Sequence, residues 1–358
     1  QEIKLDVFSI KGLDLQLISL EDGKTNWSFS SADSPPEENN GKSIANNISS
    51  FDIRGVEIRD SRIDYFDVAT NERIVLEIVD LNTDSIEFDK AFSLRGQLRV
   101  DGLVENVMAD LQLDTQAVLN SIDTSLRLNG LGFAASLQSD DYLGGAIAAE
   151  GTIAQVKDIG LERIDIKDLD ATVNVAGVNV QVSGSGNYDD SGLMMTGPLN
   201  VASFAPRELM QLLGQAVPDT VDPDTLKKLS LAGDWMLEGD TAKLENLSLQ
   251  LDDSAGTGAV RIASIGQGTY GFDLEFDKLD ADRYLSFESA AVAVDTSGDA
   301  SGGATETDDL PIDTLRGLNL DGRVRFADLE IMGIQLKNTD IRISADNGAI
   351  RLKPMTAD

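Results

Sequence analysis

Carboxylates far outnumber the other charged side chains of this chain, and two residue types that commonly do chemistry are missing. The 358 residues contain 62 Asp and Glu against 29 Lys and Arg, with no His and no Cys. Without His, neither serine–histidine catalysis nor a histidine-ligated zinc site is possible. Without Cys, there is no disulfide and no thiolate metal site. Carboxylates are therefore the groups whose patterns we consider first.

Three acidic clusters contain the residue types that bind calcium. Calcium needs six to eight oxygen ligands held on a turn, commonly in a D-x-D-x-D-G pattern that ends in Glu. None of the clusters has this pattern; helix capping explains the first of them better, and linker charge explains the third. We therefore expect no metal site and no cofactor. The clusters are Asp219/Asp222/Asp224, Asp140/Asp141 and Asp299/Glu306/Asp308/Asp309.

Two other catalytic patterns are weak. Paired carboxylates can hydrolyse glycosides, but among 62 acidic residues chance pairs are common, and the aromatic residues that form sugar platforms make up only 5%. The glycine-rich residues 184–186 and 256–258 do not open helices, so they resemble hairpin or bulge glycines and not phosphate-binding loops. We expect no catalytic residues and no enzyme activity.

The formal net charge of −33 bears on the partners. Such a surface repels the phosphate backbone of nucleic acids and disfavours docking on anionic lipid headgroups. No stretch approaches the roughly 20 apolar residues of a membrane-spanning helix. The chain begins and ends in strand-like patterns, so we interpret it as a piece of a longer protein. Nucleic acid is not an expected partner, and any membrane anchor is expected outside this piece.

The dominant pattern is the alternation of apolar and polar residues with a period of two. This alternation is typical of strands with one apolar and one polar face, as in antiparallel sheets. Gly, Asn and Asp turns separate the segments from end to end, which predicts an all-β chain. Clear examples are residues 13–17, 173–175, 178–182, 247–251, 272–276 and 341–343.

Five of these segments share a shift in phase. In each, an aliphatic and a charged residue precede Asp, Asn or Gly, and an alternating strand follows. Because Asp, Asn and Gly tolerate left-handed or bulged backbone, we predict a kink that re-aims the strand at this position. The five positions are Gly12, Asp60, Asp168, Asn246 and Asn338.

Helix is predicted only in one insertion, at about residues 204–229. A first helix should begin at Pro206 and end at Gly214, and a second should run from an Asp222 cap to Leu229. Residues 31–50 and 295–309 lack apolar side chains and are predicted to be a disordered loop and a disordered linker. The remaining parts are residues 1–30, strands that continue a missing N-terminal region; 51–294, the main β body; and 310–358, strands that continue into a missing C-terminal region.

A long sheet with one aliphatic face has two ways to place that face. It can close as a sandwich or barrel with a dry core. It can also curl into an open groove whose floor accepts acyl chains. Periodicity does not separate the two, although the cost of exposing apolar surface to water favours the closed core.

Several segments together resemble the AsmA family of Gram-negative envelope proteins. Residues 22–27 are similar to its "DG-x-x-NW" signature. Residues 204–214, followed by Asp222 and Pro223, resemble its helical insertion, with Ala205 where the family often has a capping Ser. Residues 315–322, 333–338 and 348–355 look like its downstream strands. The resemblance runs through almost the whole chain in the expected order.

The resemblance implies a protein anchored in the inner membrane by a missing N-terminal helix, with its bulk in the periplasm. It also implies an elongated, curved, mostly antiparallel sheet, either a β-taco groove or a partly closed sandwich, with one short helical insertion. Larger relatives are linked to lipid transport and outer-membrane homeostasis, so phospholipid acyl chains are the expected ligand and envelope proteins the further partners. The alternative is an assembly scaffold with a closed core and no lipid.

The candidate groove residues are those in apolar phase after each kink. Each could equally be an ordinary core residue, because alternation alone does not distinguish a floor from a core. They are Ile63, Tyr65, Ala171, Val173, Val175, Leu247, Leu249, Leu251, Ile341 and Ile343.

Overall fold

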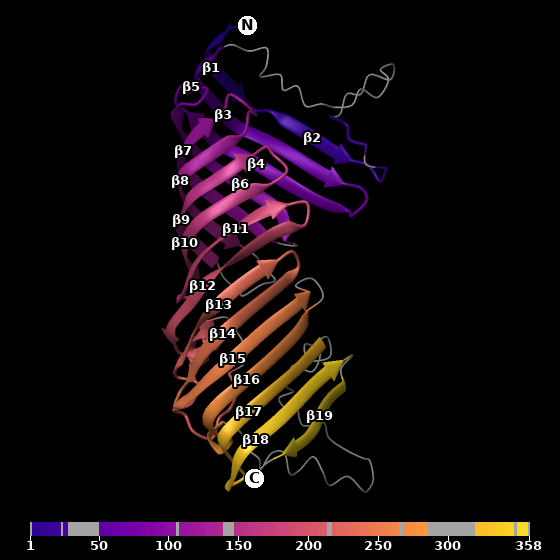
Figure 1. Ribbon diagram of the computed structural model, residues 1–358, viewed down its shortest axis with the longest axis vertical. Helices are drawn as coiled ribbons and strands as arrows, with labels where there is room; N and C mark the ends of the chain where they lie inside the picture. The colour runs from indigo at the N-terminus through magenta and orange to yellow at the C-terminus, as the bar shows by residue number, and fades with distance from the viewer. Residues whose placement is uncertain are drawn as a thin grey trace, which may run out of the picture. The chain divides into compact units, whose positions relative to one another are not determined.

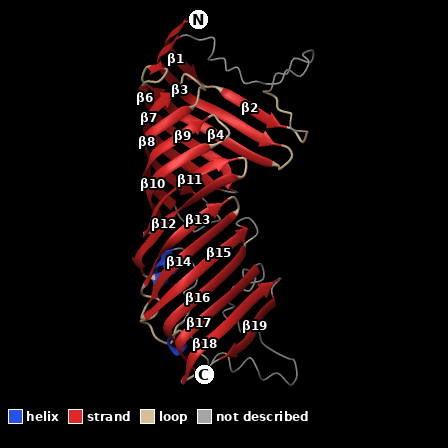
Figure 2. Ribbon diagram, viewed as in Figure 1, coloured by secondary structure: helices blue, strands red, loops and turns tan. Residues whose placement is uncertain are grey.

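The computed structural model describes residues 2–22, 24–27, 50–104, 107–138, 147–212, 217–264, 268–284, 319–346 and 349–356. The chain divides into an N-terminal unit, Gln1–Gly192, and a C-terminal unit, Leu193–Asp358. Both consist of strands that lie side by side in a sheet (Figure 1). The predicted all-β class is confirmed, and the described residues contain one short α-helix, which lies in the predicted insertion (Figure 2). Nearly all of the two predicted disordered segments lies outside the described residues.

In the N-terminal unit, β1 and β2 both pair in parallel with the long strand β3, one after the other along the same strand. All other described pairs in this unit are antiparallel, in the order β3, β4, β6, β7, β8, β9, β10 and β11, with short β5 beside β3. The strands are β1 (Glu2–Lys11), β2 (Asp14–Ser19), β3 (Ser50–Asp67), β4 (Glu72–Thr83), β5 (Ile86–Glu87), β6 (Ala91–Val104), β7 (Val107–Leu119), β8 (Leu126–Gln138), β9 (Ile147–Ile159), β10 (Ile164–Val175) and β11 (Val178–Asp189).

In the C-terminal unit, successive strands pair from β12 to β19, and the pair β16–β17 is parallel. The helix α1 (Pro206–Leu212) follows β12, and a single 3₁₀ turn, η2 (Ala281–Arg283), follows β16. The strands are β12 (Gly192–Phe204), β13 (Leu229–Glu238), β14 (Thr241–Leu251), β15 (Ser254–Ser264), β16 (Thr269–Asp280), β17 (Asn319–Ile331), β18 (Ile334–Asp346) and β19 (Ala349–Thr356).

The predicted kinks are confirmed at all five positions. Gly12, Asp60, Asp168, Asn246 and Asn338 have φ angles of 70°, 49°, 52°, 50° and 51°. At two of them, Asp168 and Asn246, the register of a neighbouring pairing also slips, as one extra residue requires. The residue that tolerates left-handed backbone therefore sets where each strand changes phase.

The predicted second helix over residues 222–229 is wrong. Asp222 does begin a turn, but Leu226 has a φ of 57°, which an α-helix does not allow. The Asp252 carboxylate accepts the N–H group of Leu226 at 2.7 Å and those of the next two residues at 2.9 and 3.0 Å. These donors point at a distant side chain instead of a carbonyl four residues back, so the helix does not form.

Candidate functional site

A continuous apolar face runs across the N-terminal unit. Residues paired in register point to the same side of a sheet, and the register links apolar side chains strand by strand. One row contains Ile63, Leu76, Val100, Ala109, Leu137, Ile147, Val175 and Val178. The next contains Ile78, Leu98, Leu111, Ala135, Ala149, Val173 and Val180. A third contains Leu81, Gly96, Leu113, Phe133, Gly151, Ala171 and Val182.

The C-terminal unit has an apolar face of its own. One row contains Val201, Leu231, Leu249, Gly256, Phe276 and Phe326 and ends at Thr339. The next contains Leu247, Gly258, Leu274, Val324 and Ile341. A third contains Trp235, Leu244, Val260, Phe272, Gly322 and Ile343. The bulge at Asn246 keeps Leu244 and Leu247 on one side, since their partners are two residues apart.

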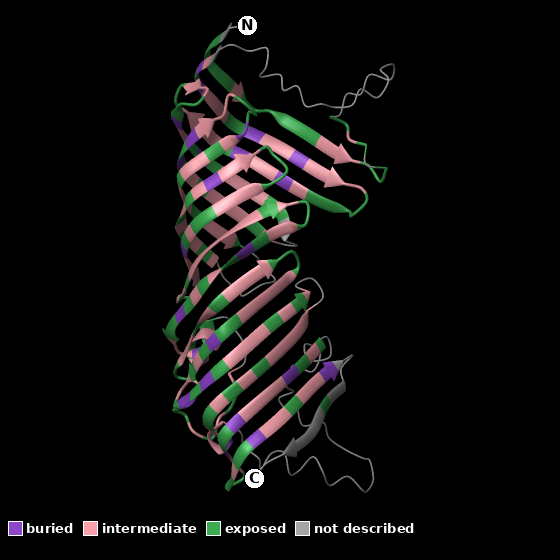
Figure 3. Cartoon of the chain, viewed as in Figure 1, coloured by how far each residue is buried: buried purple, intermediate pink, exposed green. Residues whose placement is uncertain are grey.

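All ten candidate groove residues lie on these apolar faces, five in each unit. Ala171 and Leu247 are buried, with exposed fractions of 6% and 5%, and the other eight are half-buried. Figure 3 shows that intermediate exposure prevails along the strands. Among the described residues, the one cluster of packed, buried apolar side chains consists of Ala281, Phe326 and Leu329. Most of the apolar rows are thus shielded by neighbours in the sheet without being sealed.

The opposite side of each sheet, which we call the polar face, carries charged side chains that form ion pairs across neighbouring strands. In the N-terminal unit, Glu77 lies 3.3 Å from Arg62 and 3.5 Å from Arg99, which also contacts Asp110 at 3.0 Å. In the C-terminal unit, Arg323 binds Asp340 through two hydrogen bonds of 2.9 and 2.6 Å. Opposite charges on paired strands stabilise the register and keep this face in water.

One carboxylate of the polar face is itself buried. Asp64 is 7% exposed and accepts a hydrogen bond of 2.8 Å from Arg73 Nε. The hydrogen bond from Arg73 lowers the pKa of Asp64 below its usual value, against a smaller opposing effect of burial. The group is therefore held ionised as half of an ion pair, which does not suit it to proton transfer.

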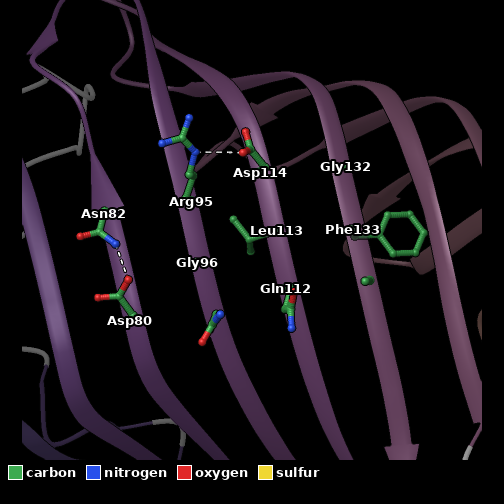
Figure 4. Close-up of a pocket in the computed structure, with 11 residues that line it drawn as sticks. Asp80, Asn82, Arg95, Gly96, Gln112, Leu113, Asp114, Gly132 and Phe133 are labelled. Atoms are coloured by element: carbon green, nitrogen blue, oxygen red, sulfur yellow. Dashed lines mark hydrogen bonds and ion pairs between the residues drawn. The ribbon is translucent and has the colours of Figure 1, made fainter.

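A hollow of about 390 Å³ opens on the polar face of β6, β7 and β8. Figure 4 shows Arg95 pointing at Asp114 and Asn82 at Asp80, with Gly132 on the next strand beside Asp114. Arg95 Nε and Asp114 are 2.9 Å apart, and Asn82 donates a hydrogen bond to Asp80. Since these groups satisfy one another, we do not assign a ligand to this hollow.

The segment that resembles the "DG-x-x-NW" signature folds back along the edge of β2. The Asn26 side chain accepts the Ile18 N–H group at 2.9 Å and donates to the Gln16 carbonyl at 2.8 Å. It thereby takes the place of a neighbouring strand. The Trp27 ring lies 6.1 Å from that of Tyr65, a candidate groove residue. The motif thus completes one edge of the apolar face.

The helical insertion is joined to η2 at one edge of the C-terminal unit. Asp222 contacts Arg283 Nε at 2.8 Å and donates its own N–H group to the Arg283 carbonyl. Tyr284 donates its hydroxyl to Asp252, at 2.7 Å. Asp282 accepts the N–H groups of Met332 and Gly333 at 2.6 and 2.7 Å. We call these contacts the edge network, and sequence reasoning missed them because their partners lie far apart along the chain.

The edge network also explains the first acidic cluster. The backbone N–H of Asp224 and the guanidinium of Arg283 lower the pKa of Asp222. Asp224 forms an ion pair with Lys227. In the part of the chain that the structure describes, no three acidic residues gather as metal ligands would. Asp140, Asp141 and the third cluster lie outside the described residues.

No described helix is long and apolar enough to cross a membrane. No curated protein and no solved structure gives a significant match to this chain. A comparison with known protein families matches the AsmA family over residues 1–358. Because that match spans the full length, in agreement with the resemblance of the individual motifs, the chain belongs to the AsmA family.

Proposed function

We propose that the apolar faces of this AsmA-family chain hold the acyl chains of phospholipids on their way between the membranes of the cell envelope. The observation that carries the proposal is the continuity of the apolar rows. In the N-terminal unit each row passes without a charged residue from β4 to β11. An acyl chain has no hydrogen-bonding groups, so an unbroken aliphatic surface is what it needs.

The incomplete burial of these rows supports an open face. A sealed sandwich would bury most of its inward side chains below a tenth of their surface, as protein cores do. Here eight of the ten candidate groove residues keep intermediate exposure. An acyl chain lying along them would remove that remaining apolar surface from water, at about 25 cal/mol per Å².

Family membership supports the location that the proposal needs. We propose that the protein works in the periplasm, anchored to the inner membrane, and supports the biogenesis or homeostasis of the outer membrane. No catalytic step is part of this function, because lipid transfer along a surface breaks no bond. Envelope proteins would be partners at either end of the path.

The matched pair Leu249→Glu and Ser248→Glu tests the proposal. Leu249 is half-buried on the apolar face, and Ser248 is exposed on the polar face of the same strand. Leu249→Glu should remove phospholipid that co-purifies with the full chain and lower the free energy of unfolding by only about 1–2 kcal/mol. Ser248→Glu should change neither quantity.

Lipid extraction with quantitative mass spectrometry and urea unfolding provide the two readouts. A loss of more than about 4 kcal/mol in Leu249→Glu, with no lipid in the unsubstituted protein, would show a sealed core. That result would favour the alternative function, a scaffold that assembles envelope proteins and carries no lipid.

A further inference from the structure

The hairpin between β17 and β18 has a turn sequence that is unusual for its backbone conformation. Its two-residue turn is Met332–Gly333, and both residues have positive φ, 54° and 70°. Turns of this kind strongly prefer Asn or Asp before Gly, because a bulky side chain is strained in the left-handed region. Met332 is nevertheless 64% exposed, so packing within the chain does not explain it. A strained, exposed apolar side chain that the fold does not use suggests a function.

The strained turn is held in place from outside the hairpin. The Asp282 carboxylate accepts both N–H groups of the turn, at 2.6 and 2.7 Å. The next residue of η2, Arg283, holds Asp222, which places Val221 at the same edge. Val221 is 61% exposed. Val221 and Met332, two exposed apolar residues from distant parts of the chain, are therefore both held by the three-residue turn η2.

The exposed apolar residues at the β17–β18 turn continue the apolar face. Leu329 pairs with Leu336 on that face, and the last pair before the turn is Ile331 with Ile334, on the same side. Ile334 is 58% exposed. The apolar surface thus becomes more exposed toward Met332 and ends in side chains that project into solvent.

We propose that this edge of the C-terminal unit, formed by Met332, Ile334 and Val221, inserts into the surface of a zwitterionic lipid bilayer. The three side chains are flexible or aliphatic, and they include none of the Trp, Tyr or Arg anchors that dominate protein interfaces. Their continuity with the apolar face suits a lipid, since acyl chains can pass from a bilayer to that face without crossing water. The net charge of −33 disfavours anionic membranes. The inference rests on the proposed function for the direction of lipid movement.

The substitution Met332→Asn gives an unusually clean test, because Asn-Gly is the preferred sequence of such a turn. The variant should fold at least as stably as the parent protein. Its partitioning onto vesicles of phosphatidylethanolamine and phosphatidylcholine should fall about tenfold. The matched control is Ile122→Asn, which removes an 80% exposed Ile from the β7–β8 turn of the N-terminal unit. That control should bind vesicles like the parent protein.

Vesicle flotation of the full chain measures partitioning, and lipid extraction of the same samples measures lipid carried on the apolar face. Equal losses in the two variants, or unchanged binding of Met332→Asn, would overturn the inference. So would self-association or binding of another protein that depends on Met332 without any binding to vesicles. Vesicle binding lost in Met332→Asn supports the inference even when no lipid co-purifies, a result that would count against the proposed function alone.

Discussion

Replacing Gly258 by Ala is expected to lower the free energy of unfolding of the C-terminal unit by about 3 kcal/mol or more. Gly258 has a φ of 153°, and a Cβ atom there would lie 2.0 Å from the Asp273 carbonyl oxygen and 2.9 Å from Leu274 Cα. Both are backbone atoms of β16, so no side chain can move aside. The strands must separate, and the apolar row through Leu247 and Leu274 would separate with them.

The matched control is Gly271→Ala, on β16. Its Cβ atom would meet the Asp321 carbonyl oxygen at 3.5 Å, an ordinary contact, and Gly271 does not have a positive φ. Its free energy of unfolding should change by less than about 1 kcal/mol. Trp27 and Trp235 lie in different units, so Trp27→Phe leaves a fluorescence signal from the C-terminal unit alone. Equal stabilities of the two glycine variants would contradict this explanation of the close approach.

Replacing Asp252 by Asn is expected to cost about 2 kcal/mol of unfolding free energy at neutral pH. The carboxylate accepts three consecutive backbone N–H groups and the hydroxyl of Tyr284. The side-chain amide of Asn has only one acceptor oxygen. Its NH2 group would face the backbone N–H groups, so hydrogen-bond donors would meet donors. The control Asp253→Asn removes one exposed ion pair with Arg283 and should cost no more than about 0.5 kcal/mol.

The Asp252 carboxylate should also make the free energy of unfolding depend on pH. Burial raises the pKa of Asp252, but the hydrogen bonds from Tyr284 and from the three N–H groups outweigh it, so the net pKa is below the ordinary value. The unfolded chain therefore binds this proton more readily than the folded protein does. The contribution is fully present above the unfolded pKa of about 3.9 and is lost as the pH falls through the lower folded value.

Urea unfolding between pH 7 and pH 3 measures this effect. The difference in stability between the parent protein and Asp252→Asn should be largest at neutral pH and shrink on acidification. A difference that stays constant down to pH 3 would mean that folding does not shift the pKa of Asp252. The nearby pKa of Asp222 is lowered too, by the Asp224 N–H and by Arg283, so the whole edge network should weaken in acid.

The kinks could be predicted from sequence because their cause is local. A single Asp, Asn or Gly allows the left-handed conformation, and the shift of apolar phase on either side shows where it is needed. Asp60 and Asn338 illustrate this, with φ angles near 50°. The same logic placed all ten candidate residues on the apolar faces, since the period-two pattern alone decides which side chains share a side.

The edge network could not be predicted because its causes are distant. Asp252 prevents the helix expected after Asp222 by accepting N–H groups more than 20 residues away. The parallel pairing of β16 with β17 was equally invisible, since alternation looks the same in either direction. Met332 has no helix or strand signal of its own, and its strain becomes visible only once the turn is known.

The most direct test of the lipid-binding face is photocrosslinking from neighbouring positions on opposite sides of one strand. A photoreactive residue would replace Val173 or Leu249 on the apolar faces, and Asn174 or Ser248 on the polar faces. The full chain, purified with its co-purifying lipid and analysed by mass spectrometry, should give phospholipid adducts from Val173 and Leu249 only. Adducts at all four positions, or no adducts in a correctly folded protein, would contradict the account.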